Sequence, residues 1–164
     1  MDKLSKWTAT YTQNPICGNP VKIGRERLKH GLPIKALWIN NKISNVGVAH
    51  GVSDAEEICA RFATEFSCHK ENIIPLSTGI IGWQLPKDDM IDNVNHITHG
   101  DDTVAEMARA IMTTDSYPKA YKETLSNGSS VVGVAKGAGM IEPNMATTII
   151  VIMTDADMEQ SFMN

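Results

Sequence analysis

Apolar side chains recur at helical spacing in the first half of the chain. Ile58, Phe62 and Phe66 stand at positions i, i+4 and i+8, which places them on one face of a helix. Ser53 and Glu56, just before them, have the spacing of a capping box, in which the serine hydroxyl accepts a hydrogen bond from the Glu56 N–H. The pattern predicts a helix that starts at this box and ends near Cys68.

Two later stretches also carry an apolar stripe at helical spacing. The first runs from residue 87 to residue 97, and the second begins at another capping box, formed by Thr103 and Glu106. The stripe residues are Met90, Ile91, Val94 and Ile97 in the first stretch, and Val104, Met107, Ala108 and Ile111 in the second.

Several short runs have the apolar, β-branched or aromatic composition that is typical of strands. They are Trp7–Thr12, Lys35–Ile39, Ile73–Leu76, Ser130–Ala135 (after the turn signal Asn127-Gly128) and Thr147–Met153. Because helices lie between the early and late strands, the predicted fold class is α/β or α+β.

Composition favours one soluble domain without a nucleic-acid or membrane partner. The chain has 164 residues, 42% of them hydrophobic, and a net charge of −4 with scattered basic residues. It has no apolar run of about 18 residues and no apolar signal core near its start, so a cytoplasmic location is expected. The three cysteines have neither disulfide-framework nor zinc spacing, and no carboxylate or cysteine at metal-ligand spacing completes a site with His96-x-x-His99.

The segment with the most chemical content runs from Lys136 to Thr148, immediately before an apolar strand. A threonine placed here could become a nucleophile if the peptide bond before it were cut, because its new α-amine would lie beside its own hydroxyl and act as general base. Such an amine titrates near pH 8, so much of it is unprotonated at cellular pH. The alternative is an ordinary glycine- and proline-containing loop that leads into a core strand.

Four motifs in order resemble the ornithine acetyltransferase family, also called glutamate N-acetyltransferases. They are Pro75-Leu-Ser-Thr-Gly-Ile-Ile-Gly-Trp-Gln-Leu-Pro86, Ala110-Ile-Met-Thr-Thr-Asp-Ser-Tyr-Pro-Lys119, Gly133-Val-Ala-Lys-Gly-Ala-Gly-Met140, and the continuation to Ala146-Thr147. The resemblance covers nearly the whole chain. It implies a layered α-β-β-α fold, here incomplete, and self-cleavage between Ala146 and Thr147.

The resemblance also implies how the chain is organised. Residues 1–164 would form a single truncated domain, in which 1–146 correspond to the family's α chain and 147–164 to the start of its β chain. The family's β half supplies further site residues, so the expected partners are that missing half and a higher oligomer. The chain alone is expected to be poorly active or inactive, and prone to association.

Residue by residue, the resemblance assigns Thr147 as nucleophile and substrate contact, and Thr78 and Gly79 as the oxyanion hole. Lys136 and Thr113 are expected to bind substrate, Lys136 through a carboxylate. Thr148 is a rival for the nucleophile and Thr114 for the substrate contact.

The implied reaction passes acetyl from N2-acetylornithine to Thr147 and then to glutamate, in arginine biosynthesis. Acetyl-CoA is an alternative donor in some relatives, and no metal or tightly held organic cofactor is implied. Two other interpretations stay open: a related self-cleaving hydrolase, in which water takes the acyl group, and an inactive remnant or partner half of a split enzyme.

Overall fold

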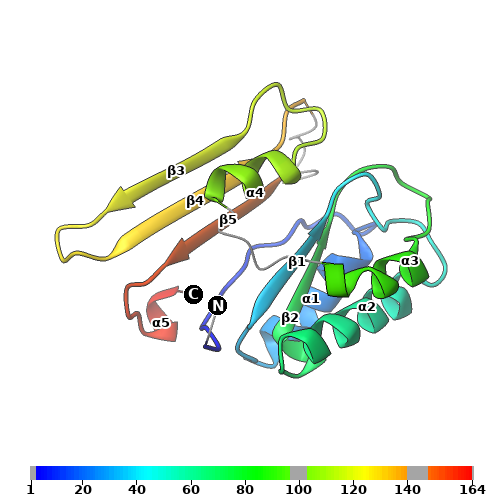
Figure 1. The fold of residues 1–164 in the computed structure, drawn as a ribbon, viewed down its shortest axis with the longest axis horizontal. Coiled ribbons are helices and arrows are strands. Elements are labelled where there is room, and N and C mark those ends of the chain that lie inside the picture. The colour runs from blue at the N-terminus through cyan, green and yellow to red at the C-terminus, as the bar shows by residue number, and fades with distance from the viewer. Residues whose placement is uncertain (1–2, 97–102, 140–147, 164) are drawn as a thin grey trace. The chain divides into compact units, whose positions relative to one another are not determined.

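The computed structural model describes residues 3–96, 103–139 and 148–163. They belong to two compact units, residues 1–98 and residues 99–164, each of which has its own sheet (Figure 1). Mixed helix and sheet is the predicted class, and the structure confirms it.

The first unit contains a parallel pair of strands and the helices that pack on it. Its strands β1 (Ala36–Asn40) and β2 (Ile73–Ser77) run in parallel, with Ala36 opposite Ile73. Its helices are α1 (Asn19–Lys29), α2 (Gly51–Glu65) and α3 (Lys87–Asp92), with short 3₁₀ turns at Lys70–Asn72 and Val94–His96. The buried core draws on both strands and on α1 and α2, and includes Ile23, Trp38, Ile58, Cys59 and Ile73.

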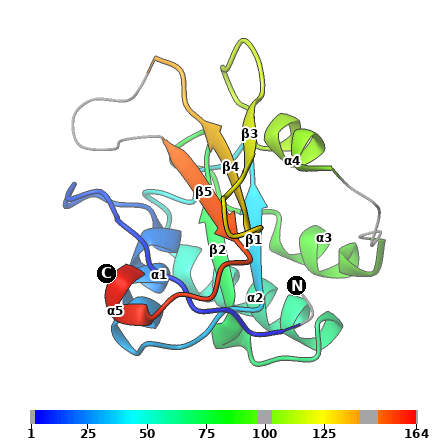
Figure 2. The ribbon, with the colours of Figure 1, turned by 90° about the vertical axis from the view of Figure 1, so that its left-hand side faces the viewer.

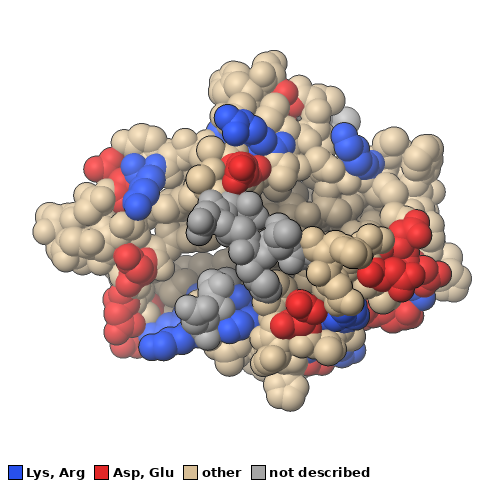
Figure 3. All heavy atoms as spheres, viewed as in Figure 1, with Lys and Arg blue, Asp and Glu red and all other residues tan. Residues whose placement is uncertain are grey.

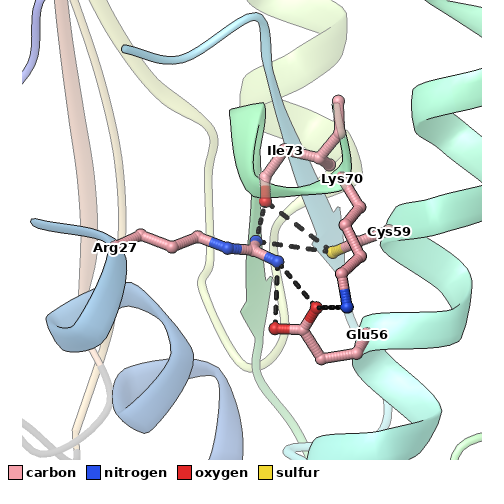
Figure 4. Close-up of polar contacts among 5 residues, drawn as sticks. All are labelled: Arg27, Glu56, Cys59, Lys70 and Ile73. Atoms are coloured by element: carbon pink, nitrogen blue, oxygen red, sulfur yellow. Dashed lines mark hydrogen bonds and ion pairs between the residues drawn. The ribbon is translucent and has the colours of Figure 1, made fainter. Parts of the chain in front are cut away.

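A buried arginine joins three elements of this unit (Figure 4). Arg27 of α1 donates from Nη2 to both carboxylate oxygens of Glu56 in α2, each at 3.0 Å, and from Nη1 to the Ile73 carbonyl of β2. Lys70 lies 3.3 Å from the same carboxylate, and the Cys59 thiol contacts the guanidinium. Burial raises the pKa of Cys59 to about 11, against the opposing effect of its hydrogen bond from Arg27. Because the guanidinium donates to a carboxylate of α2 and to a carbonyl of β2, Arg27 fixes α1 against both elements.

The second unit is an antiparallel sheet with the order β3-β4-β5. Its strands are β3 (Lys119–Thr124), β4 (Ser130–Lys136) and β5 (Ile149–Thr154), and its helices are α4 (Val104–Ala110) and α5 (Gln160–Met163). Figure 2 shows the three strands side by side, with α4 next to β3. The register places Lys119 opposite Ala135 and Lys136 opposite Ile149.

The two predicted capping boxes have different outcomes. Thr103 and Glu106 form theirs: the Glu106 N–H donates to Thr103 Oγ1, and the Thr103 N–H to Glu106 Oε2. The box at Ser53 is wrong, because α2 already begins at Gly51 and the Ser53 hydroxyl donates to the His50 carbonyl. The helix also ends at Glu65, earlier than the predicted end near Cys68.

The predicted strand at Trp7–Thr12 is also wrong. The described residues there form no strand, and the only bridge nearby joins Ser5 to Ile34. Trp7 instead donates from Nε1 to the Leu32 carbonyl at 2.6 Å. β-branched and aromatic residues favour a strand only where a neighbouring strand supplies the hydrogen-bond ladder.

The remaining predicted elements are largely confirmed. Strands at 35–39, 73–76 and 130–135 correspond to β1, β2 and β4, while the stripe at 87–97 is divided between α3 and a 3₁₀ turn. β5 begins at Ile149, and Thr147 and Ile97 lie outside the described residues.

Charged side chains of both signs lie on the surface. On the face drawn in Figure 3, basic and acidic side chains are interspersed. Among the described residues, none of the helices has the length and hydropathy needed to cross a membrane.

Candidate functional site

The Thr78–Gly79 turn follows directly from the end of β2. Thr78 is buried, and its N–H donates at 3.1 Å to the carbonyl of Asn40, the last residue of β1, so the pairing of the two strands continues one residue beyond β2. Gly79 has a φ of +135°, and a Cβ added there would lie 2.1 Å from the Lys42 carbonyl carbon. Only glycine therefore fits, because the two backbone segments meet at this point.

The segment opposite Gly79 is itself anchored. The Ile80 N–H donates to the Lys42 carbonyl at 2.7 Å, and the Ser44 N–H donates to the Ile80 carbonyl at 3.0 Å. Asn45 is fully buried with a φ of 53° and donates from its amide to the Gly51 carbonyl at 2.8 Å. These contacts hold the Thr78–Gly79 turn in one conformation.

Lys136, in the second unit, is the last residue of β4 and is only 1% exposed. Burial lowers the pKa of its ammonium, while the nearby Asp115 carboxylate raises it. A buried lysine beside a loop is unusual, since long charged side chains are rarely enclosed unless a partner or ligand compensates the charge.

Asp115 connects three segments of the second unit. Its Oδ1 accepts from Lys119 Nζ at 2.6 Å and from the Gly137 N–H at 2.8 Å, and its Oδ2 accepts from the Thr113 N–H at 3.2 Å. Its side chain is 1% exposed. Burial raises the pKa of Asp115, but the hydrogen bonds from Lys119, Gly137 and Thr113 outweigh it, so the net shift is strongly downward. The carboxylate is therefore ionised at neutral pH.

The structure brings some of the predicted site residues together. Thr113, exposed in the turn after α4, and Lys136 lie in the same unit, and Asp115 links the Thr113 backbone to Gly137, the residue after Lys136. Thr78 and Gly79 belong to the other unit. Ala146 and Thr147 lie outside the described residues, whereas Thr148 is described and half-buried just before β5.

Asp115 and Lys119 were not predicted as site residues from the sequence. Both lie within the motif that predicts Thr113, and their four-residue spacing was the available signal. Four-residue spacing usually indicates neighbours on a helix, but here the chain turns and starts β3. No group of three or more side chains suited to holding a metal occurs among the described residues.

Together these features define a mixed helix-and-sheet protein with a glycine-dependent turn after β2 and a buried lysine at the end of β4. The ArgJ family model matches residues 1–164. The chain belongs to the ArgJ family.

Named relatives and solved structures agree with this assignment. Arginine biosynthesis bifunctional protein ArgJ 2 of Clostridium acetobutylicum is 37% identical over 161 residues, which cover 96% of this chain and 41% of the relative. Arginine biosynthesis bifunctional protein ArgJ of Neisseria meningitidis serogroup A is 39% identical over 157 residues, which cover 93% and 38%. The chain thus spans about two fifths of the length of the curated relatives it matches.

Two crystal structures share the fold. Arginine biosynthesis bifunctional protein ArgJ from Bacillus halodurans superposes with a TM-score of 0.78 at 31% identity, covering 88% of this chain and 78% of that one. Ornithine acetyltransferase from Mycobacterium tuberculosis, complexed with ornithine, superposes with a TM-score of 0.75 at 30% identity, covering 87% and 78%.

Proposed function

We propose that this chain provides part of an acetyltransferase that moves acetyl from N2-acetylornithine to glutamate in arginine biosynthesis. The family assignment and the ornithine complex of the Mycobacterium tuberculosis relative support the substrate class. The observation that carries the proposal is Lys136, a buried basic side chain at the end of β4, ten residues before the Ala146–Thr147 bond in the sequence. A lysine ammonium is a compact charge suited to a substrate carboxylate.

The proposed maturation step is an acyl shift at Ala146–Thr147. Thr147 Oγ attacks the Ala146 carbonyl carbon, the C–N bond breaks, and the acyl group passes to the hydroxyl oxygen as an ester. Water then hydrolyses the ester, which restores the hydroxyl and leaves a free α-amine on Thr147. That amine serves as the general base of the mature enzyme.

The proposed transfer uses the same hydroxyl twice. Thr147 Oγ attacks the acetyl carbonyl of N2-acetylornithine, ornithine leaves with a proton, and the glutamate amine then takes the acetyl group from the threonine ester. Thr78 and Gly79 stabilise the oxyanion of each tetrahedral intermediate. The Thr78 N–H already donates to Asn40, so the proposal assigns this role to the Thr78 hydroxyl and the Gly79 N–H.

Lys136 and Thr113 bind the substrate in this proposal. Acetyl-CoA is a further proposed donor. The acetyl group is carried as an ester of Thr147, so the proposed reaction uses no metal or tightly held organic cofactor. A second polypeptide corresponding to the remainder of the relatives' length completes the site, within a higher oligomer.

The experiment is the intact mass of freshly purified protein, compared with Thr147→Ala. We expect two pieces divided between Ala146 and Thr147, and one uncleaved mass for Thr147→Ala, because the variant lacks the attacking oxygen. Thr148→Ala is the matched control and should be cleaved as the unsubstituted chain is. Cleavage that survives Thr147→Ala but is lost in Thr148→Ala would move the nucleophile by one residue. A single intact mass for the unsubstituted chain would contradict cleavage by this chain alone.

A further inference from the structure

One buried carboxylate holds three separate segments of the second unit. Asp115 binds the turn after α4 through Thr113, the start of β3 through Lys119, and the end of β4 through Gly137. The two oxygens accept three hydrogen bonds, all of them charge-assisted because the carboxylate is ionised, and the bond from Lys119 is also an ion pair. A carboxylate so fully satisfied and so little exposed defines the relative positions of its donors.

Both polar groups of the Gly137 peptide are held by the same pair. The Gly137 N–H donates to Asp115 Oδ1 at 2.8 Å, and the Gly137 carbonyl accepts from Lys119 Nζ at 3.1 Å. Lys119 also pairs with Asp115 at 2.6 Å, which closes a small ring of contacts. Gly137 has a φ of +146°, a conformation that a residue with a side chain rarely adopts. The chain direction just after Lys136 is therefore determined by Asp115 and Lys119.

We propose that Asp115 and Lys119 are the positioning pair of the substrate-carboxylate site, because they fix Lys136 from one side through Gly137 and Thr113 from the other. This inference rests on the proposed function, in which Lys136 and Thr113 bind the substrate.

The charges of the cluster agree with this role. Lys119 neutralises Asp115, so the three side chains Asp115, Lys119 and protonated Lys136 together carry one positive charge. An isolated buried aspartate here would repel a substrate carboxylate, whereas the paired one leaves the cluster with the attractive sign. The pair thus orders the site without opposing the ligand.

The test compares Asp115→Asn with Asp155→Asn in the full chain. Asp155 is a matched control, since its Oδ1 accepts the Ser130 N–H at 2.7 Å at the opposite end of β4. Three properties are measured by NMR and thermal unfolding: hydrogen exchange of the Gly137 and Ser130 amides, the Kd for N2-acetylornithine, and Tm.

Asp115→Asn should speed exchange of the Gly137 amide and weaken binding, each about tenfold, because a hydrogen bond to a charged acceptor is lost. Asp155→Asn should speed exchange at Ser130 and leave Gly137 and the Kd unchanged. Lys119→Arg, which keeps the charge and the donors, should retain binding close to that of the unsubstituted chain. Lys119→Met should bind more weakly than Asp115→Asn, because it leaves the Asp115 charge unpaired beside the substrate carboxylate.

If Asp115 only stabilised the fold, Asp115→Asn would lower Tm but would change the Kd for N2-acetylornithine no more than Asp155→Asn does. Unchanged Gly137 exchange in Asp115→Asn, or equal weakening of binding by both aspartate variants, overturns the inference.

The proposed function fails separately. If the unsubstituted chain does not bind N2-acetylornithine, or Lys136→Met binds as tightly as it does, Lys136 is not a substrate contact in this chain. Two measurements then test whether Asp115 and Lys119 position Lys136: hydrogen exchange of the Gly137 amide, and the rate at which acetic anhydride acetylates Lys136. Asp115→Asn should raise that rate and Asp155→Asn should not; equal rates would overturn the positioning of Lys136.

Discussion

Gly79 shows at the residue scale how one backbone contact determines a site turn. Its φ of +135° and the 2.1 Å separation of an added Cβ from Lys42 are independent obstacles to any side chain. Gly82, three residues later, has a φ of +83° but open space around it. The two glycines therefore separate the effect of dihedral strain from the effect of a backbone clash.

We predict that Gly79→Ala lowers the free energy of unfolding by about 3 kcal/mol, since both strain and displacement of the Lys42 backbone contribute. Gly82→Ala should cost about 1 kcal/mol, from the left-handed conformation alone. Urea unfolding followed by tryptophan fluorescence measures both, because all three tryptophans lie within residues 1–98. Equal losses in the two variants would contradict the close approach at Gly79.

Single residues also show what could be predicted of the site. Thr78, Gly79, Thr113 and Lys136 were predicted from motifs, and those motifs carry no distances. Asp115 was not singled out, because its importance lies in donors that come from three segments of the chain, which only the fold brings together. An aspartate followed by serine, tyrosine and proline is typical of an ordinary turn.

At the scale of elements, the two helix starts show that a capping signal needs its structural context. Thr103 accepts the Glu106 N–H at the start of α4, whereas Ser53 already lies inside α2. The capping-box spacing is therefore expected to stabilise the helix at Thr103 and not at Ser53.

Thr103→Ala should lower the free energy of unfolding by about 1 kcal/mol, because the orphan N–H at the helix start loses its acceptor. Ser53→Ala should change it by less than about 0.5 kcal/mol, as is usual for an exposed substitution away from a cap. Urea titrations followed by far-ultraviolet circular dichroism compare the two. A loss at Ser53 as large as that at Thr103 would mean that the Ser53 hydroxyl supports α2 after all.

Two elements that the sequence did not predict, α1 and β3, have weak apolar patterns. α1 was missed because several of its buried residues are polar or small, including Asn19, Gly24 and Arg27, so no apolar stripe marks it. β3 was missed because it is nearly all exposed and rich in charged residues. Apolar periodicity finds elements that bury hydrocarbon, and these two are stabilised instead by buried polar contacts and by pairing with β4.

At the scale of the whole molecule, β5 is an edge strand of the described sheet and carries exposed apolar side chains. Ile150 is 61% exposed and Ile152 is 71% exposed, while Val151 between them is buried. An edge strand with unpaired backbone groups and apolar side chains favours pairing with another chain. This surface, Ile150 and Ile152 of β5, is where association of the chain is expected.

We predict that the purified chain associates with increasing concentration and that Ile152→Lys shifts it toward the monomer, because a charge on an edge strand opposes pairing. Ile16→Lys is the matched control, since Ile16 is 76% exposed and lies outside the strands. Sedimentation velocity at several concentrations measures the effect. If both variants dissociate the chain equally, association depends on general hydrophobicity and not on β5.

The β4–β5 pairing has a further consequence for a chain cut at Ala146–Thr147. Six residue pairs join the two strands, from Val131 opposite Thr154 to Lys136 opposite Ile149, and they lie on either side of the cut in the sequence. The cut falls between Lys136 and Ile149 in the sequence, and these two residues are paired in the sheet. Severing the backbone would therefore leave a nicked but undivided sheet: two bands on a denaturing gel, and one particle in native buffer.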